Sequence, residues 1–270
     1  MIGIFDSGYG GLTVFKPIIE LLPEYDYIYL GDSARAPYGG RSGEVIKKFS
    51  EEAVEFLFKH GANLIIFACN TASSLALRHV QEKYLKGPNE RERKILGVLI
   101  PVAEEAVKTT KNGHIGVIGT KATIQSKVYE TEIHKLKPHI KVFQQACPLL
   151  VPFIEENWHK KPEANSILKK YLLPLKSTHI DTLIPGCTHY PLMIGQIEKY
   201  MGKKTKILHS GEITAGKLKE YLERHPEIDS KLAKNKNRTF FTTDNPRRFK
   251  EFTEQHFGMK IKMPAQIELG

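Results

Sequence analysis

Cys69 and Cys187 are the residues of this 270-residue sequence whose type and surroundings best suit chemistry. Residues 64–68 form a short apolar run that leads into Cys69-Asn70-Thr71, and residues 182–186 form another that leads into Cys187-Thr188-His189. Short apolar runs bounded by polar residues are typical of buried strands, and a helical pattern follows each cysteine. We therefore expect both thiols at turns that lead from a strand into a helix.

Thiols at such turns suit proton transfer, because the ordinary cysteine pKa of about 8.5 lies near neutrality. A helix N-terminus stabilises a thiolate, so we expect it to lower the pKa of both cysteines further. Asp6 and His189 are natural proton-handling groups beside them. Two groups on opposite faces of one carbon can remove a proton from one face and deliver one to the other. This geometry inverts a stereocentre, whereas a hydrolase triad needs a single nucleophile.

Removal of the α-proton of a free amino acid is usually assisted by pyridoxal phosphate, which acts as an electron sink. That route needs a Schiff-base lysine, and no lysine of this sequence lies in a recognisable cofactor turn. Backbone NH groups and hydroxyl groups can instead hold the carboxylates of a small substrate. The candidate hydroxyl groups are those of Ser7, Thr71, Thr120 and Thr188.

The elements that must position these residues alternate between strands and helices, which predicts parallel sheets. A glycine-rich turn at residues 6–11 separates the first expected strand from a helical pattern. We expect strands at residues 2–5, 27–30, 64–68, 95–100, 114–118, 140–143, 182–186, 206–209 and 238–243, and late helices at 151–157, 167–175 and 246–257. Residues 86–94 are expected to form a surface loop.

The order of these elements repeats along the chain. Residues 2–7 correspond to residues 115–120, residues 27–30 to residues 141–144, and Cys69 to Cys187. Ligands of open α/β sheets bind beyond the carboxyl ends of the strands. We therefore predict an α/β fold with two pseudo-symmetric domains of mostly parallel sheets and an active site in the interdomain cleft. The predicted domains are residues 1–97 with 210–270, and residues 98–209.

Composition and cysteine usage indicate a soluble protein of a reducing compartment. The sequence is 41% hydrophobic and 26% charged, as in ordinary globular proteins. No apolar run approaches the roughly 20 residues of a membrane span, and the N-terminus lacks the basic region of a signal peptide. Three scattered cysteines do not make a disulfide framework, so we predict a cytoplasmic location and a structural role for Cys147.

Two alternatives of other classes rest on the charge and the thiols. The net charge of +10 is compatible with nucleic-acid binding, but its sources lie late in the chain, apart from both cysteine turns. A solvated basic surface is the favoured interpretation, with no nucleic acid required. A thiol-redox protein would instead form a Cys69–Cys187 disulfide under mild oxidation. A metal site is not predicted, because Cys187-x-His189 is not accompanied by CxxC or HxxxH spacing.

Four blocks of the sequence resemble the signature motifs of bacterial glutamate racemase, of the aspartate/glutamate racemase superfamily. They are FDSGYGGLTV at residues 5–14, Gly31-Asp32 with Pro37-Tyr38-Gly39, ACNTAS at 68–73 and GCTHYPL at 186–192. The blocks occur in the order of that family, and the resemblance extends to residues 240–243. The nearest alternative is a sister enzyme such as an aspartate racemase.

The resemblance implies a cofactor-independent enzyme that interconverts L- and D-glutamate and supplies D-glutamate for peptidoglycan. It implies Cys69 as the base for the D enantiomer and Cys187 as the base for the L enantiomer. Asp6 and His189 would assist them, with Glu155 supporting the histidine. A homodimer is also expected, with no metal. The implied substrate-binding residues are Asp6, Ser7, Tyr38, Gly39, Asn70, Thr71, Thr120, Thr123, Thr188 and His189.

Overall fold

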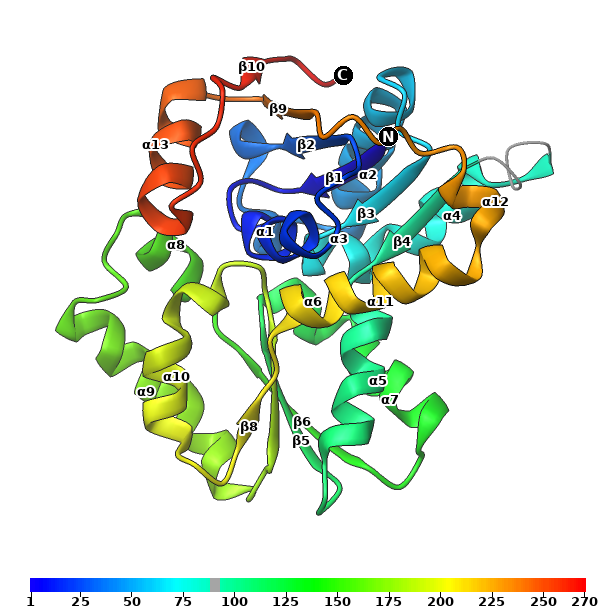
Figure 1. Ribbon diagram of the computed structural model, residues 1–270. Helices are drawn as coiled ribbons and strands as arrows, with labels where there is room; N and C mark the ends of the chain where they lie inside the picture. Colours follow the sequence, from blue (N-terminus) through cyan, green and yellow to red (C-terminus); the bar gives the residue numbers. More distant parts are fainter. Residues whose placement is uncertain (88–92) are drawn as a thin grey trace.

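The computed structural model describes residues 1–87 and 93–270, and within them the chain forms two parallel sheets (Figure 1). Residues 88–92 of the expected surface loop lie outside the described residues. The first sheet has the order β10-β9-β2-β1-β3-β4 and the second β6-β5-β7-β8. The strands are β1 (Ile2–Asp6), β2 (Tyr27–Gly31), β3 (Leu64–Phe67), β4 (Lys94–Gly97), β5 (His114–Gly119), β6 (Lys141–Ala146), β7 (Thr182–Gly186), β8 (Lys206–Ile207), β9 (Arg238–Thr242) and β10 (Ala265–Gln266).

The predicted repeat is confirmed by the strand order. In the first sheet β1 lies between β2 and β3, and in the second β5 lies between β6 and β7. The next strand, β4 or β8, pairs in parallel with the strand that leads into a cysteine. The central strands of the two sheets are therefore arranged in the same order. The predicted α/β class with parallel sheets is confirmed.

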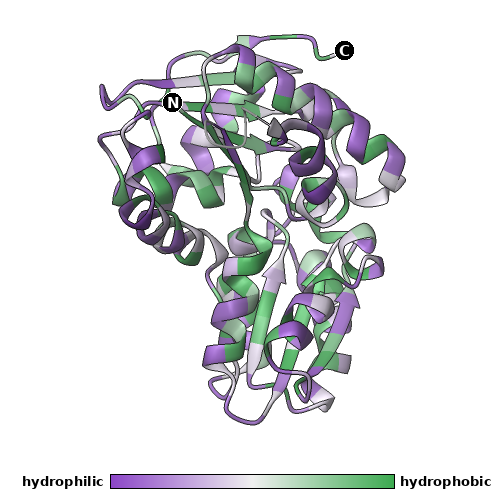
Figure 2. Cartoon of the chain, turned by 90° about the vertical axis from the view of Figure 1, so that its right-hand side faces the viewer, coloured by the Kyte–Doolittle hydropathy of each residue, from purple (hydrophilic) through white to green (hydrophobic). Residues whose placement is uncertain are grey.

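Helices cover both faces of each sheet, because the buried strands carry apolar residues on both sides. The first sheet packs against α2 (Gly43–Lys59), α3 (Asn70–Leu75) and α4 (Leu77–Tyr84) on one face, and against α1 (Leu12–Leu21), α11 (Ser210–Arg224) and α13 (Pro246–Phe257) on the other. The second packs against α5 (Leu99–Thr109) and α7 (Val128–Leu136), and against α9 (Pro162–Ser177) and α10 (Ile194–Met201). Figure 2 shows the hydrophobic strands and the hydrophilic outer faces of the helices.

One apolar cluster extends through both halves of the molecule. It includes Tyr9 and Leu12 next to the first sheet, and Leu150 and Tyr190 next to the second. Several shorter elements connect the main strands and helices. They are η1 (Ser33–Arg35), η2 (Tyr38–Gly40), α6 (Lys121–Gln125), α8 (Leu150–Glu155), η4 (Tyr190–Met193) and α12 (Pro226–Asp229).

Some expected element bounds were wrong. The strand expected at residues 95–100 ends at Gly97, and α5 begins at Leu99 with Pro101 in its first turn. A proline is tolerated there because the first NH groups of a helix have no intrahelical partner. The helix expected at 151–157 ends at Glu155, and Asn157 adopts a left-handed conformation with φ 58°. The helix expected at 246–257 is confirmed.

Candidate active site

Most of the candidate residues lie where four strands, β1, β3, β5 and β7, end. Asp6 is the last residue of β1, and Cys69 follows β3 after a single alanine. In the second half Thr120 follows β5 directly, and Cys187 follows β7 directly. Since the strands are parallel, these ends share one edge of each sheet, and the two edges meet across a small cavity.

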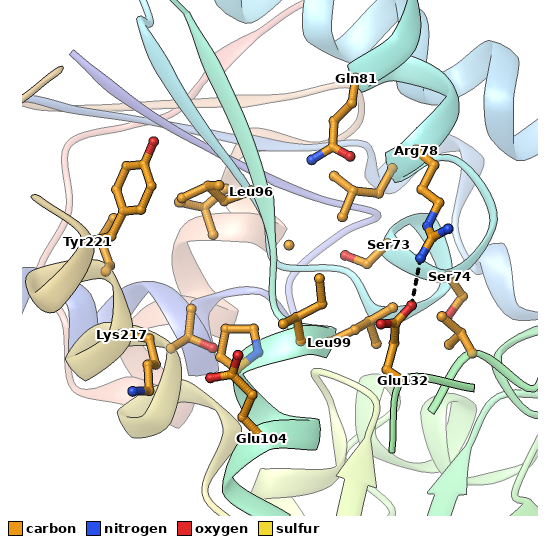
Figure 3. A pocket seen from close by; sticks show the side chains of 18 of the residues that line it. Ser73, Ser74, Arg78, Gln81, Leu96, Leu99, Glu104, Glu132, Lys217 and Tyr221 are labelled. Carbon is orange, nitrogen blue, oxygen red and sulfur yellow. Dashed lines mark hydrogen bonds and ion pairs between the residues drawn. The ribbon is translucent and has the colours of Figure 1, made fainter. Parts of the chain in front are cut away.

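The cavity between the two halves has a volume of about 20 Å³, enough for about one water molecule. Both thiols line it, one from each half. Its other predicted residues are Ser7, Tyr38, Gly39, Asn70, Thr71, Thr120, Glu155, Thr188 and His189. A larger pocket of about 590 Å³ lies elsewhere, between Ser73, Leu99 and Tyr221, and no predicted site residue lines it (Figure 3).

The structure departs from the predicted lining in a few places. Asp6 and Thr123 are fully buried behind the cavity wall and do not line it. Ala36, Pro37 and Val151 line it without having been predicted as site residues. Val151 lies four residues before Glu155 in α8, so helical spacing places both side chains on one face. This helical spacing is the only feature of the sequence that could have indicated Val151 as a lining residue, because an apolar side chain has no reactive group.

Cys69 is the N-cap of α3, as expected, but its pKa is not lowered. Its thiol donates to Ser7 Oγ at 3.4 Å, and its sulfur accepts from the backbone NH of Ala72 at 3.5 Å. Burial and the neighbouring charge of Asp6 raise the pKa of Cys69 to about 12. The expectation of a lowered pKa was wrong here, because desolvation outweighs two weak hydrogen bonds at the start of a six-residue helix.

Cys187 has a different setting, and the expectation of a helix start at this cysteine was wrong. The 3₁₀ turn η4 follows it, and α10 begins only at Ile194. The charge beside its sulfur comes from a side chain instead: His189 Nδ1 lies 3.9 Å from Cys187 Sγ, and His189 Nε2 lies 3.0 Å from Glu155 Oε1. Burial lowers the pKa of His189, but the interactions with Cys187 and Glu155 outweigh this effect and raise the pKa to about 10. At neutral pH an imidazolium therefore lies beside the sulfur of Cys187.

Asp6 connects the two halves behind the cavity. Its carboxylate accepts from the backbone NH of Gly8 at 3.0 Å and from Thr188 Oγ1, in the other half, at 3.3 Å. Burial raises the pKa of Asp6, while the charge of His189 and these hydrogen bonds oppose the rise. The site thus combines two thiols with unequal helpers, a buried carboxylate near Cys69 and a histidine–carboxylate pair near Cys187.

The comparisons with known proteins agree with this arrangement. The family model for Asp/Glu/hydantoin racemases matches residues 3–218. A glutamate racemase of Listeria monocytogenes is 39% identical over 269 residues, which cover 100% of this chain and 98% of the relative. The crystal structure of glutamate racemase isoform RacE1 from Bacillus anthracis has a TM-score of 0.90 at 40% identity, with 100% of this chain and 97% of that chain covered. The chain belongs to the glutamate racemase family.

A further solved relative is the glutamate racemase of Francisella tularensis in complex with D-glutamate. It has a TM-score of 0.88 at 32% identity, and covers 99% of this chain and 97% of its own. Membership in this family makes the protein an amino-acid racemase, which is an isomerase. None of the helices in residues 1–87 and 93–270 combines the length and the apolar character of a membrane span.

Hydrogen bonds hold the walls of this racemase's cavity. Asp32 accepts from the hydroxyl of Tyr38, from Arg35 Nε at 2.7 Å and from Thr243 Oγ1 at 2.8 Å. The Tyr38 hydroxyl is therefore already bonded to protein. Gly39 lies so close to Thr120 that a β-carbon on Gly39 would be 2.6 Å from Thr120 Cβ.

A second set of contacts joins the two halves across the racemase's cavity. Thr71 Oγ1 lies 2.9 Å from Thr120 Oγ1, which in turn donates to Thr123 Oγ1 at 3.0 Å. The hydroxyl of Tyr129, in α7, donates to Asn70 Oδ1 at 2.7 Å. Thr123 and Tyr129 therefore orient residues of the cavity wall from behind. The sequence gives no indication that Tyr129 belongs to the site, because it occupies an ordinary apolar position in a helical pattern.

The remaining candidate groups lie apart from the cavity. Cys147 is fully buried, and its thiol donates to the carbonyl oxygen of Gln145 at 3.6 Å. Within the described part of the chain, no group of three or more His, Cys, Asp or Glu side chains could hold a metal ion.

Proposed function

We propose that this racemase interconverts L- and D-glutamate without a cofactor, with Cys69 and Cys187 as the two bases. The observation that supports this most directly is that both thiols open onto one cavity from opposite halves of the molecule. A planar carbanion between them would have one sulfur on each face. Glutamate is the proposed substrate because the similar proteins are glutamate racemases, one of them solved with D-glutamate.

In the proposed direction from L- to D-glutamate, the Cys187 thiolate takes the α-proton and the Cys69 thiol delivers its proton to the opposite face. The raised pKa of Cys69 keeps that thiol protonated at neutral pH, ready to donate. The imidazolium of His189 stabilises negative charge on Cys187. Each turnover adds one proton to one sulfur and removes one from the other, so the total number of protons on the pair is unchanged. In the reverse direction Cys69 takes the α-proton and Cys187 delivers one.

A cavity of about 20 Å³ is too small for glutamate, so we propose that the two halves move apart to admit it. The proposed substrate contacts come from polar groups of the cavity wall. The hydroxyl groups of Ser7 and Thr71 and the amide of Asn70 offer hydrogen-bond donors for two carboxylates. The hydroxyls of Thr120 and Thr188 donate to Thr123 and Asp6, and we propose that they exchange these bonds for the substrate. Tyr38 and Gly39 are proposed to contribute shape, because the Tyr38 hydroxyl is already bonded to Asp32. Asp6 and Thr123 act from behind the wall.

The wider role proposed for the enzyme is the supply of D-glutamate for peptidoglycan synthesis in the cytoplasm, as a homodimer. Three free cysteines are compatible with a reducing compartment. We also propose domain boundaries that divide residues 1–97 with 210–270 from residues 98–209, because the two sheets follow this division.

The proposed activity is tested by incubating the protein with L-glutamate in deuterated water without added cofactor. We expect the optical rotation to decay to zero and deuterium to enter the α-position of the product, since the donated proton comes from a thiol that exchanges with solvent. L-Aspartate in a parallel incubation should react far more slowly. Absence of both changes with glutamate would contradict the proposal, and faster reaction of aspartate would favour the sister activity.

Replacing Glu155 with glutamine should weaken catalysis and shift its pH dependence. The substitution removes the carboxylate that helps to hold the pKa of His189 at about 10, so the imidazolium should lose its proton at lower pH. We expect kcat/KM near neutral pH to fall about tenfold, and its alkaline limb to move down by about one unit or more. Enantiomers have equal free energies, so kcat/KM must agree for both substrates, and any asymmetry must be sought in kcat and KM separately. An unchanged alkaline limb would contradict the role of Glu155.

A further inference from the structure

The C-terminal helix α13 lies beside the first sheet, and one of its ends is next to α8 of the other half (Figure 1). Its start is well defined, because Asn245 Oδ1 accepts from the backbone NH groups of Arg247 and Arg248 at 2.9 and 3.2 Å. Its other end is held by Lys16, whose Nζ donates to the carbonyl oxygen of Phe257 at 3.1 Å. The helix is therefore anchored at both ends.

The apolar face of α13 packs on the turn that follows Asp6. The ring of Phe252 stacks on Tyr9 with centroids 5.0 Å apart, and Phe249 lies 5.6 Å from the same ring. Tyr9 belongs to the turn whose Gly8 donates to the Asp6 carboxylate. The apolar face of α13 therefore supports the turn that holds Asp6, in the first half of the molecule.

The polar face of α13 reaches the segment that follows Glu155 in the other half. Arg248 Nη2 lies 3.0 Å from Glu156 Oε1, and His256 Nε2 lies 2.7 Å from Asn157 Oδ1. The rings of His256 and His159 also lie 5.5 Å apart. Three successive contacts therefore connect α13 to residues 156–159, immediately after the carboxylate that bonds His189.

We propose that Arg248 and Glu156 are positioning residues for racemisation, which hold Glu155 against His189 by tying residues 156–159 to α13. The inference rests on the proposed function, because it assigns the tie a role in the chemistry at Cys187. Glu156 follows Glu155 in the chain, and Arg248 lies near enough for the two charges of Arg248 and Glu155 to interact. Neither Glu156 nor Arg248 lines the cavity. An exposed ion pair adds little to global stability, so its disruption should act on geometry more than on folding.

Exchange of the two charges provides the test. We expect Arg248→Glu and Glu156→Arg each to lower kcat/KM about tenfold, and the double variant to recover to within about threefold of the wild type. Arg247→Glu is the matched control: it makes the same change of charge one residue earlier, where the guanidinium makes no such tie in the part of the chain that the structure describes. It should leave kcat/KM nearly unchanged.

Two further measurements separate positioning from a general structural effect. In a Glu155→Gln background, Arg248→Glu should cause no additional loss, because the residue through which it acts is already disabled. Hydrogen exchange at the backbone amides of residues 156–161 should rise in both single variants and return in the double variant. This exchange is measured without turnover, so it tests the tie even if the wild-type protein proves inactive on glutamate, a result that would overturn the proposed function.

The inference is overturned if neither single variant loses activity, if the double variant does not recover, or if Arg247→Glu is as harmful as Arg248→Glu. It is also overturned if exchange rises while kcat/KM and its pH profile stay unchanged, because the tie would then have no effect on the chemistry.

Discussion

Replacing Cys69 or Cys187 with serine is expected to lower kcat/KM for glutamate racemisation by about 10³-fold or more. A serine hydroxyl is a far weaker acid than a thiol, so it neither forms the base nor delivers a proton at a useful rate. Each variant retains only one competent group, and inversion needs one on each face of the α-carbon. Loss of optical rotation with each pure enantiomer measures the effect.

Cys147→Ser is the matched control for this pair, because Cys147 is equally buried but lies outside the cavity. We expect it to retain activity within a few-fold of the wild type, with some loss of stability from placing a hydroxyl in an apolar site. Substantial activity in either Cys69→Ser or Cys187→Ser would show that a single base is sufficient and would exclude the two-thiol mechanism.

The second large effect is expected from Gly10→Ala, which adds one methyl group to the turn after β1. A β-carbon at Gly10 would lie 2.5 Å from both His189 Nδ1 and Thr188 Oγ1, closer than atoms can approach. Both side chains are buried, so His189, Thr188 or the turn itself must shift, and the 3.9 Å approach of His189 Nδ1 to Cys187 Sγ is disturbed. A displacement of about 1 Å at a catalytic group costs about 10²-fold, and we expect kcat to fall by that order.

Gly8→Ala tests whether this loss is specific. A β-carbon at Gly8 would have its nearest neighbour, Ala36 Cβ, at an ordinary 3.8 Å, and the NH that bonds Asp6 would remain. We expect near-normal kinetics from Gly8→Ala and an unchanged circular dichroism spectrum from both variants. Equal losses in the two variants would mean that the turn tolerates no side chain at all, and that the contact with His189 is not the cause.

Local patterns in the sequence were sufficient to predict the α/β class, the parallel pairing and the repeated order of elements along the chain. Strand length, alternation with helices and a polar residue at each strand end are properties of short segments, so they can be read without knowing distances. The same logic placed Cys69 and Cys187 at strand ends. Most of the predicted lining residues belong to these turns, and they reach the cavity for that reason.

Tertiary structure alone decided the electrostatics of the site and the contacts that cross between its halves. The pKa of Cys69 rises because the folded chain buries the thiol beside Asp6, although the residues form a helix N-cap that would lower it in water. Arg248 meets Glu156 across 92 positions of sequence. Desolvation and contacts between distant segments depend on how the layers pack, and no local pattern of residues encodes that packing.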